Sequence, residues 1–299
     1  MPGASKNIRK RIKSVASTKK ITRTMEMVAT SKLQRTQGRV IASRPYQAAM
    51  RVLVTALSSA VTSLGGAPLF EKRTPTKRVI VLLLTSNRGL CGGYNANLVR
   101  KCAEHVRSVA AEGAEVILHV AGRKGLAAMR FAGVAVASGR TDLTDRPTFA
   151  EAESVAAPLL EAFLAREVDR VDVVFADFRT ASQQPPTAAT LLPIGAEAGQ
   201  PAAKSGAHGE APSADEYLFE PSATDILKAL GAVYVTNTVY RMLLSAVASE
   251  MLSRRVAMKN ASDNAKEMER SLTRAYNKAR QAGITQEIAE IVGGAAALE

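Results

Sequence analysis

The segment of this chain best suited to chemistry is "TSNRGLCGGYNANL", Thr85–Leu98, which follows an apolar run and precedes a helical pattern. Glycine-rich turns between a strand and a helix can bind phosphate through backbone N–H groups at the helix N-terminus. The spacing is neither GxGxxG nor GxxxxGKS/T, and no acidic residue lies at the distance that holds a ribose in dinucleotide-binding proteins. The segment therefore predicts a tight strand-to-helix turn. A phosphate-binding enzyme that uses residues 88–95 stays open as an alternative.

Cys91 lies in the same segment and could be a nucleophile if a histidine lay beside it. His105, His119 and His208 belong to no motif that would place them there, so a structural thiol is favoured. The second cysteine, Cys102, forms no CxxC pair with the first, and a reducing compartment is expected. No Ser/His/Asp signature or paired carboxylates occur. The sequence thus predicts no catalytic residue, no cofactor and no metal.

The segments around this turn alternate between short apolar runs and helical patterns, which is typical of an α/β domain with a mainly parallel sheet. Residues 187–194 add an edge strand that Pro193 limits. Residues 195–214 are rich in Ala, Gly, Pro and Ser and predict a flexible insertion. The central α/β domain is expected over residues 75–194, with strands at 79–84, 116–120, 134–137 and 171–178 and helices at 95–112, 123–131 and 149–168.

Two proline-free stretches flank this domain, one over residues 3–44 and one after Pro221. Proline removes a hydrogen-bond donor and clashes inside a helix, so its absence predicts a long helix at each end of the chain. Ser222 or Thr224 can cap the second helix, which would extend for ~100 Å at about 1.5 Å per residue. We expect these two helices to cover residues 1–60 and 215–299.

The second long helix carries a seam of residues at alternating steps of three and four positions. Eleven of its twelve members are apolar and the exception is Arg254, so the seam has the period of a left-handed coiled coil. The first helix offers a partner stripe that contains a phase slip. We therefore expect an antiparallel pair within one chain in preference to a coiled coil between two copies. The stripes are Leu244, Val247, Met251, Arg254, Met258, Ala261, Ala265, Met268, Leu272, Ala275, Ala279 and Ala282, and Ile8, Ile12, Val15, Ile21, Met25 and Val28.

Positive charge is concentrated at the start of the chain. Lys plus Arg outnumber Asp plus Glu by 40 to 27, and residues 1–51 hold thirteen of the cations with a single acid, Glu26. Such a segment indicates a polyanionic or acidic partner. A basic coiled coil that binds nucleic acid is one alternative, although Trp is absent and the first aromatic residue is Tyr46. A protein partner with acidic loops fits the charge at least as well.

The sequence gives no sign of a membrane-spanning or secreted segment. Eighteen apolar residues never follow one another without a charge, and no apolar core with a cleavage site follows the basic N-terminus. We therefore expect neither a transmembrane helix nor a signal peptide.

Three motifs at separate places in the chain belong together. The first is "IRKRIKSVASTKKITRTMEMVATSKL", which contains KIT-x-x-MEMVA-x-SK. The second is "RGLCGGYNANL", and the third comprises "VAMKNASDNAKE" and "YNKARQAGITQEIAEIVGGA". In all three places the chain closely resembles the γ subunit of the bacterial rotary F-type (F1Fo) ATP synthase.

The resemblance implies a fold and a mechanism. In that family the two terminal helices form an asymmetric shaft inside an α3β3 ring, and the α/β domain belongs to a foot joined to the ε subunit and the membrane c-ring. This implies a non-catalytic rotor shaft, one copy per complex, that couples proton flow to ATP synthesis or hydrolysis on the β subunits and helps to regulate both. It also implies a peripheral location on the cytoplasmic face of the bacterial inner membrane.

The resemblance further implies roles for individual residues. Met25 matches a shaft residue whose charge state affects coupling, and Arg254 matches one that faces the β subunits. Gln281, Thr285 and Glu287 match a polar group that contacts a β loop, while Tyr217 and Glu220 match foot residues near the c-ring. A basic collar is expected to meet the acidic β loops. Its members are Lys19, Lys20, Arg23, Lys32 and Arg35.

Overall fold

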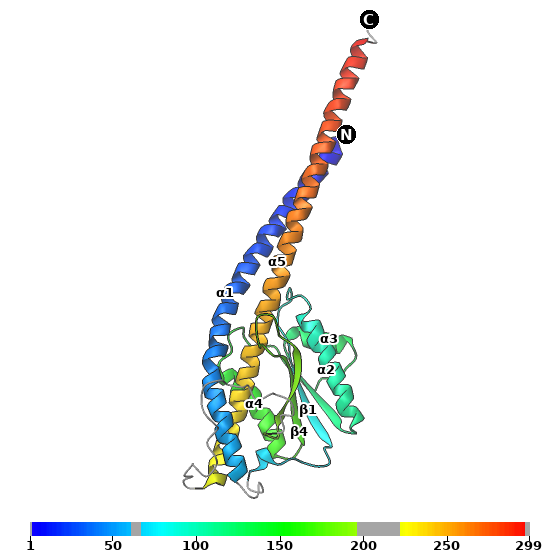
Figure 1. Cartoon of the computed structure of the whole chain (residues 1–299). Coiled ribbons are helices and arrows are strands. Elements are labelled where there is room, and N and C mark those ends of the chain that lie inside the picture. The colour runs from blue at the N-terminus through cyan, green and yellow to red at the C-terminus, as the bar shows by residue number, and fades with distance from the viewer. Residues whose placement is uncertain (1, 61–66, 196–221, 297–299) are drawn as a thin grey trace. The chain divides into compact units, whose positions relative to one another are not determined.

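The computed structural model describes residues 2–60, 67–195 and 222–296. The chain has a long helix toward each end, and the strands of a sheet lie between them in sequence (Figure 1). The chain divides into two compact units, called here the terminal unit (Met1–Ser31 with Arg254–Glu299) and the sheet unit (Lys32–Ser253). The elements are α1 (Pro2–Ala60), η2 (Pro68–Phe70), β1 (Arg78–Leu84), α2 (Tyr94–Ala111), β2 (Glu115–Ala121), α3 (Arg123–Phe131), β3 (Ser138–Arg140), α4 (Phe149–Leu164), β4 (Arg170–Ala176), β5 (Pro186–Leu192) and α5 (Ala223–Ala296).

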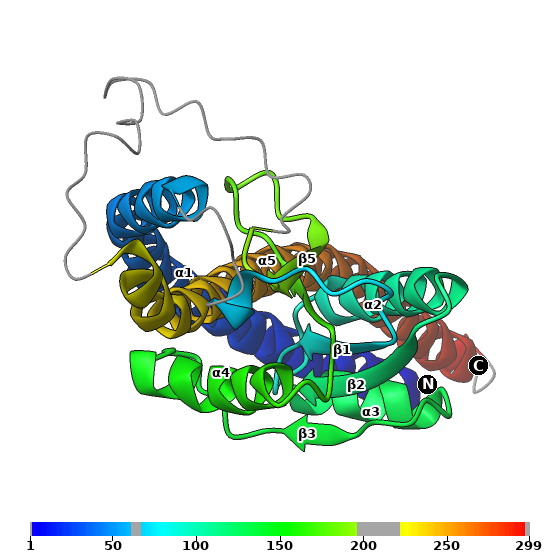
Figure 2. The same ribbon diagram turned by 90° about the horizontal axis from the view of Figure 1, so that it is seen from below.

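The sheet has five strands in the order β3-β2-β1-β4-β5. Strands β1 to β4 run parallel, and β5 pairs antiparallel with β4 at one edge. Figure 2, seen from below, shows β3, β2, β1 and β5 following one another in this order. The predicted α/β fold with a mainly parallel sheet is confirmed, and so are an edge strand near residues 187–194 and a helix at 123–131.

The predicted strand at residues 134–137 is wrong. The residues that pair with β2 are Ser138–Arg140, and Val134 is exposed. After α3 ends at Phe131, Gly133 takes a positive φ of 69°, and the next residues carry the chain to the sheet edge. Apolar composition alone does not distinguish such a connection from a strand.

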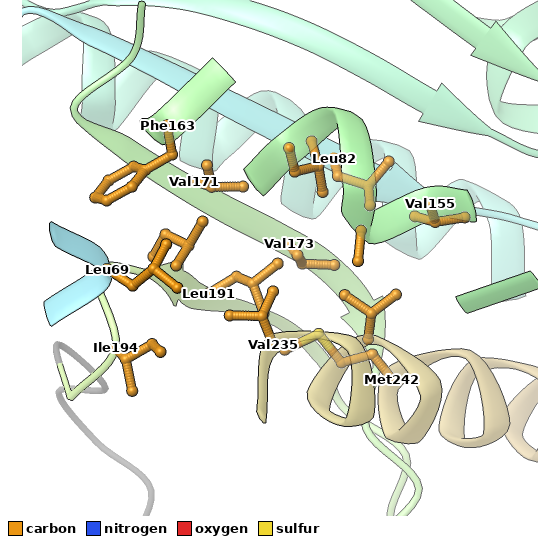
Figure 3. Packing of buried hydrophobic residues seen from close by; sticks show 14 of the residues in the cluster. Leu69, Leu82, Val155, Phe163, Val171, Val173, Leu191, Ile194, Val235 and Met242 are labelled. Carbon is orange, nitrogen blue, oxygen red and sulfur yellow. The ribbon is translucent and has the colours of Figure 1, made fainter. Parts of the chain in front are cut away.

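Helices cover both faces of the sheet because its central strands are apolar on both sides. One face of β1 and β4 packs on α2 and α3, with Leu98, Cys102 and Met129 buried. The other face packs on α4, on the first part of α5 and on the last part of α1. Figure 3 shows this second core, where Val235 and Met242 of α5 lie on the side of β4 that carries Val173, and Val171 lies nearer Phe163 of α4.

The ends of the long helices follow from local chemistry. The Ser222 hydroxyl accepts a hydrogen bond from the Asp225 amide at 3.1 Å, which is the predicted N-cap of α5. Helix α1 continues past Pro45 as far as Ala60, with the exposed Pro45 ring on its surface. The predicted insertion at 195–214 lies, apart from Gly195, outside the described residues.

The described ranges, residues 2–60, 67–195 and 222–296, contain neither a membrane-spanning helix nor a cluster of metal ligands. No helix there is long and apolar enough to cross a bilayer. Nor do three or more His, Cys, Asp or Glu side chains gather there in a way that could hold a metal ion.

Candidate functional site: the paired helices and their attachment to the sheet

The turn between β1 and α2 is closed by its own polar groups. Asn95 accepts a hydrogen bond from the Ser86 amide at 3.1 Å, and its Nδ2 donates to Ser86 Oγ at 2.8 Å and to Cys91 Sγ at 3.2 Å. Cys91 is 2% exposed. These bonds fix the Ser86, Cys91 and Asn95 side chains to one another, and Gly92 takes a positive φ of 57°, as a tight turn requires.

The start of α3 is likewise occupied. The amides of Arg123, Lys124 and Gly125 donate to Asn87 Oδ1, Ser86 O and Thr85 Oγ1 at 3.0, 3.1 and 3.0 Å. Gly122 permits this close approach, because its φ is 109° and a Cβ there would lie 2.3 Å from the Thr85 carbonyl oxygen. Helix N-terminal amides are the groups that bind phosphate in related folds, and these three are already satisfied by the chain.

The crevice beside β1 and β4 is filled by α5. Parallel α/β sheets ordinarily bind ligands at the carboxyl ends of the strands where the order reverses, which here is between β1 and β4. Tyr94 is the first residue of α2, and its Oη donates a hydrogen bond of 3.0 Å to the Ala246 carbonyl of α5. From the end of β4, the Phe178 amide donates to Ser245 Oγ at 2.6 Å, and the Ala176 carbonyl accepts from Ser249 Oγ at 3.3 Å. The position of a ligand is thus taken by one turn of the chain's own helix.

His105 does not approach Cys91. Its Nε2 lies 2.9 Å from Asp172 Oδ2, and that carboxylate also accepts from Arg170 Nε at 3.0 Å and from Thr190 Oγ1 at 2.8 Å. The pKa of the Cys102 thiol is raised to about 12 by burial, so it stays protonated at neutral pH. These contacts stabilise the fold, and they engage His105 with Asp172 while burial keeps the Cys102 thiol protonated.

Polar contacts also attach α1 to the sheet unit. Lys32 forms an ion pair with Asp145, and Arg39 Nη2 donates to the Pro147 carbonyl at 2.7 Å and to Tyr240 Oη at 3.0 Å. The hydrogen bond from Lys32 lowers the pKa of Asp145 below its ordinary value. Sequence patterns gave no sign of these contacts, because each joins residues more than a hundred positions apart.

The buried face of α1 follows one unbroken heptad pattern. Thr22 and Ala29 are 9% and 1% exposed, whereas Ile21 and Val28 are 60% and 50% exposed. The predicted phase slip after Val15 is therefore wrong. The heptad pattern continues there through small and polar residues, which a search for apolar residues alone leaves out. A continued count by sevens from Ile8 would have found it. The members that are buried or half-buried are Ile8, Ile12, Val15, Lys19, Thr22, Glu26, Ala29, Leu33, Thr36, Val40, Ser43, Gln47, Met50, Val54 and Leu57.

Within the terminal unit the α5 seam also includes polar residues. Met258 and Ala265 are buried as expected, but Met268 is 51% exposed and its neighbour Glu269 is half-buried. Glu269 Oε2 lies 2.5 Å from Lys19 Nζ, so an ion pair joins the two helices in this unit. The contact fits the expected antiparallel pair, with small residues and one ion pair in place of large apolar side chains.

The predicted contact residues differ in how much surface they expose. Arg254 is only 8% exposed and Met25 is half-buried, whereas Gln281, Thr285 and Glu287 are all exposed. The structure does not bring these five residues together at one place on α5 or α1. Tyr217 and Glu220 lie outside the described residues.

The last turns of α5 leave large apolar side chains uncovered. Ile284, Ile288 and Ile291 are 48%, 57% and 70% exposed, and Val292 is 62% exposed. They recur at steps of three and four, so they form a stripe on one face of the helix. A contiguous apolar stripe of this kind indicates a surface that a partner covers.

The basic collar is partly neutralised inside the chain. Lys19 pairs with Glu269, Lys32 with Asp145, and Arg23 with Glu26 at 2.8 Å. Lys20 and Arg35 are exposed. The collar therefore presents less positive charge to a partner than the composition predicts.

The fold and the occupied crevice define a class: a pair of long antiparallel helices joined to an α/β domain whose ligand crevice is closed by one of those helices. The family model for ATP synthase matches residues 4–298. The ATP synthase gamma chain of Gemmatimonas aurantiaca is 44% identical over 294 residues, covering 98% of both chains. That of Frankia casuarinae is 42% identical over 303 residues, covering 100% of this chain and 99% of the relative. The chain belongs to the ATP synthase gamma chain family.

Solved structures share the fold. A chain from the Euglena gracilis mitochondrial ATP synthase, OSCP/F1/c-ring, in rotational state 3, aligns with a TM-score of 0.66 at 19% identity, over 100% of this chain and 95% of that one. A chain from the central stalk/c-ring structure of the Tetrahymena thermophila enzyme aligns with a TM-score of 0.56 at 21% identity, over 81% and 99%. Both likenesses concern the arrangement of helices and strands.

Proposed function

We propose that this chain is the central rotor shaft of a bacterial F1Fo ATP synthase. It couples proton flow through the membrane c-ring to conformational cycling of the β subunits, and it helps to regulate ATP hydrolysis and proton flow. The observation that carries the proposal is the near full-length similarity to relatives named ATP synthase gamma chain. The chain itself is non-catalytic, and the active sites belong to the β subunits.

The partners follow from the same role. The shaft turns inside the α3β3 ring, and the α/β domain joins the ε subunit and the c-ring, with one copy of the chain per complex. Association with the cytoplasmic face of the inner membrane is peripheral and passes through these partners. No cofactor is required, because the chain transmits torque and performs no chemistry.

Contacts with the β subunits are assigned to two parts of the terminal unit. Gln281, Thr285 and Glu287 lie among the exposed isoleucines near the end of α5, so polar and apolar groups there can contact a surrounding ring together. Met25 and Arg254 are the other proposed contacts, and Arg254 would contribute only a small part of its surface. Differential contact with each β conformation is what lets rotation change their nucleotide affinity.

The basic collar is proposed to meet acidic β loops mainly through Lys20 and Arg35, the two members that the ion pairs described above do not include. Such charges attract across a wet gap and are screened by salt, so they keep the shaft centred without fixing it. Tyr217 and Glu220 remain proposed contacts of the foot with the c-ring.

Pull-down of the intact chain from detergent-solubilised membranes tests the proposal. We expect the α and β subunits to be recovered with it, together with ε and the c-ring under mild conditions. Recovery of nucleic acid without these subunits would sink the rotor assignment and favour the basic coiled coil that binds nucleic acid. Nucleotide binding by the isolated chain, lost in Gly92→Val with the fold intact, would instead support the phosphate-binding alternative.

A further inference from the structure

Four buried threonine and serine hydroxyl groups of α5 in the sheet unit fall into two kinds. Thr236 and Thr238 donate to carbonyls of their own helix, Ala232 and Tyr234, at 3.0 and 2.8 Å. Ser245 and Ser249 instead bond the end of β4, although both sites are buried and offer no solvent. One turn of α5 is therefore specialised for bonds that leave the helix.

We propose that this turn is a torsional joint, through which the α/β domain and α5 are forced to rotate together. Tyr94, Ser245 and Ser249 are its positioning residues. The inference rests on the proposed function, because a joint that resists twisting matters only in a chain that transmits torque. The crevice between β1 and β4, which would hold a ligand in other α/β domains, thus has a mechanical role in this chain.

The geometry of the three bonds suits this role. Apolar packing is non-directional, so it opposes separation of α5 from the sheet more strongly than small rotation of the helix about its axis. Hydrogen bonds weaken steeply away from linearity. Tyr94 reaches α5 from the start of α2, while Ala176 and Phe178 reach it from the end of β4, so the bonds hold α5 from both sides of the crevice.

Burial strengthens the joint. Ser245, Ser249 and Tyr94 are 5%, 0% and 6% exposed, so water cannot replace a bond that a twist has broken. The ion pair between Lys32 of α1 and Asp145 differs in this respect. The Lys32 and Asp145 side chains are 31% and 36% exposed, and water can exchange with that ion pair. Torque is therefore expected to pass into α5 more than into α1.

The test uses the complete ATP synthase in vesicles with the triple variant Tyr94→Phe/Ser245→Ala/Ser249→Ala. ATP hydrolysis and ATP-driven proton uptake are measured together. We expect hydrolysis to continue while proton uptake against an opposing gradient is largely lost. The matched control, Thr236→Val/Thr238→Val, removes two buried hydroxyls from the same helix without cutting a bond to β4, and should keep the uptake of the unmodified enzyme.

A second measurement separates torsion from stability. With the α3β3 ring fixed to a surface and a probe on the exposed Arg107 position of α2, the angular fluctuation of the probe should widen in the variant and not in the control. If the triple variant fails to assemble, Tyr94→Phe alone decides, since it removes one hydroxyl and keeps the ring. If proton uptake and the angular fluctuation of the probe in the variant equal those of the unmodified enzyme, the proposed torsional joint is wrong. An unmodified chain that supports no proton uptake would contradict the proposed function instead.

Discussion

At the scale of single residues, the most demanding position is Asp172. This carboxylate is 1% exposed on β4 and is satisfied by His105, Arg170 and Thr190, which come from α2, β4 and β5. A buried charge costs several kcal/mol unless each of its oxygens is paired. The three bonds therefore join α2, β4 and β5, and the stability of this part of the fold depends on each of the three partners.

We expect Asp172→Ala to lower the free energy of unfolding by roughly 3–5 kcal/mol, because it leaves Arg170 and His105 without their buried partner. Urea unfolding of the isolated chain measures this. The matched control is Asp142→Ala, which also removes a carboxylate bonded to an arginine two residues away, but one whose side chain is 62% exposed. It should cost less than about 1 kcal/mol. Equal losses would mean that burial does not decide the effect.

At the scale of elements, the question is which face of α1 packs in the terminal unit. Lysine at position 22 would bury a charge in the seam, so we expect Thr22→Lys to lower local stability by about 1–3 kcal/mol. Amide hydrogen exchange of residues 8–29 in the isolated chain reports this local opening. Ile21→Lys should change exchange little, since Ile21 is 60% exposed. If Ile21→Lys increased exchange more than Thr22→Lys, the packed face of α1 would be the apolar stripe through Ile21 and Val28, which excludes Thr22.

The ion pair between α1 and the loop before α4 gives a prediction about pH. Because Lys32 holds the pKa of Asp145 below its ordinary value of 3.8, the pair stabilises the folded chain above that value. The contribution is lost as pH falls through the lower folded-state pKa. The difference in unfolding free energy between the unmodified chain and Asp145→Asn should thus be present at about pH 7 and shrink below about pH 4.

A double-mutant cycle isolates this effect. In a Lys32→Met background, the pH-dependent difference shown by Asp145→Asn should be much smaller, because the hydrogen bond that contributes most to lowering the pKa of the carboxyl is gone and only the charges of Arg88 and Arg146 still lower it. A difference of the same size in both backgrounds would assign the acid sensitivity to other groups around Asp145.

At the scale of the whole molecule, the proposed function predicts how a change on the shaft affects coupling. Met25→Lys adds a cation to a segment that already holds an excess of them. An attraction that favours one β conformation should slow rotation in the others. We expect ATP yield per proton in vesicles to fall by a larger factor than ATP hydrolysis. Unchanged yield would count against a contact of residue 25 with the ring.

The end of α5 carries a separate prediction. Gln281→Ala or Thr285→Ala should lower turnover of the complex while nucleotides still bind to the β subunits, because under the proposed function these exposed residues contact the ring and not the nucleotide. Gln286→Ala is a suitable control, since its amide donates to Glu290 of the same helix at 2.9 Å. Lost nucleotide binding in the first two variants would show that residues 281 and 285 have another role.

The sequence by itself determined the α/β class, two long helices and the family, because hydrophobic period, proline placement and contiguous motifs are local properties of the chain. A count by sevens from Ile8 and a search for apolar residues give different stripes on α1, and the tertiary structure decided between them: Thr22 and Ala29 lie in the seam in place of Ile21 and Val28. It also decided that Ser245, Ser249 and Tyr94 close the crevice. Polar contacts between distant residues leave no periodic signal, and close helix packing selects small side chains that hydrophobicity does not mark.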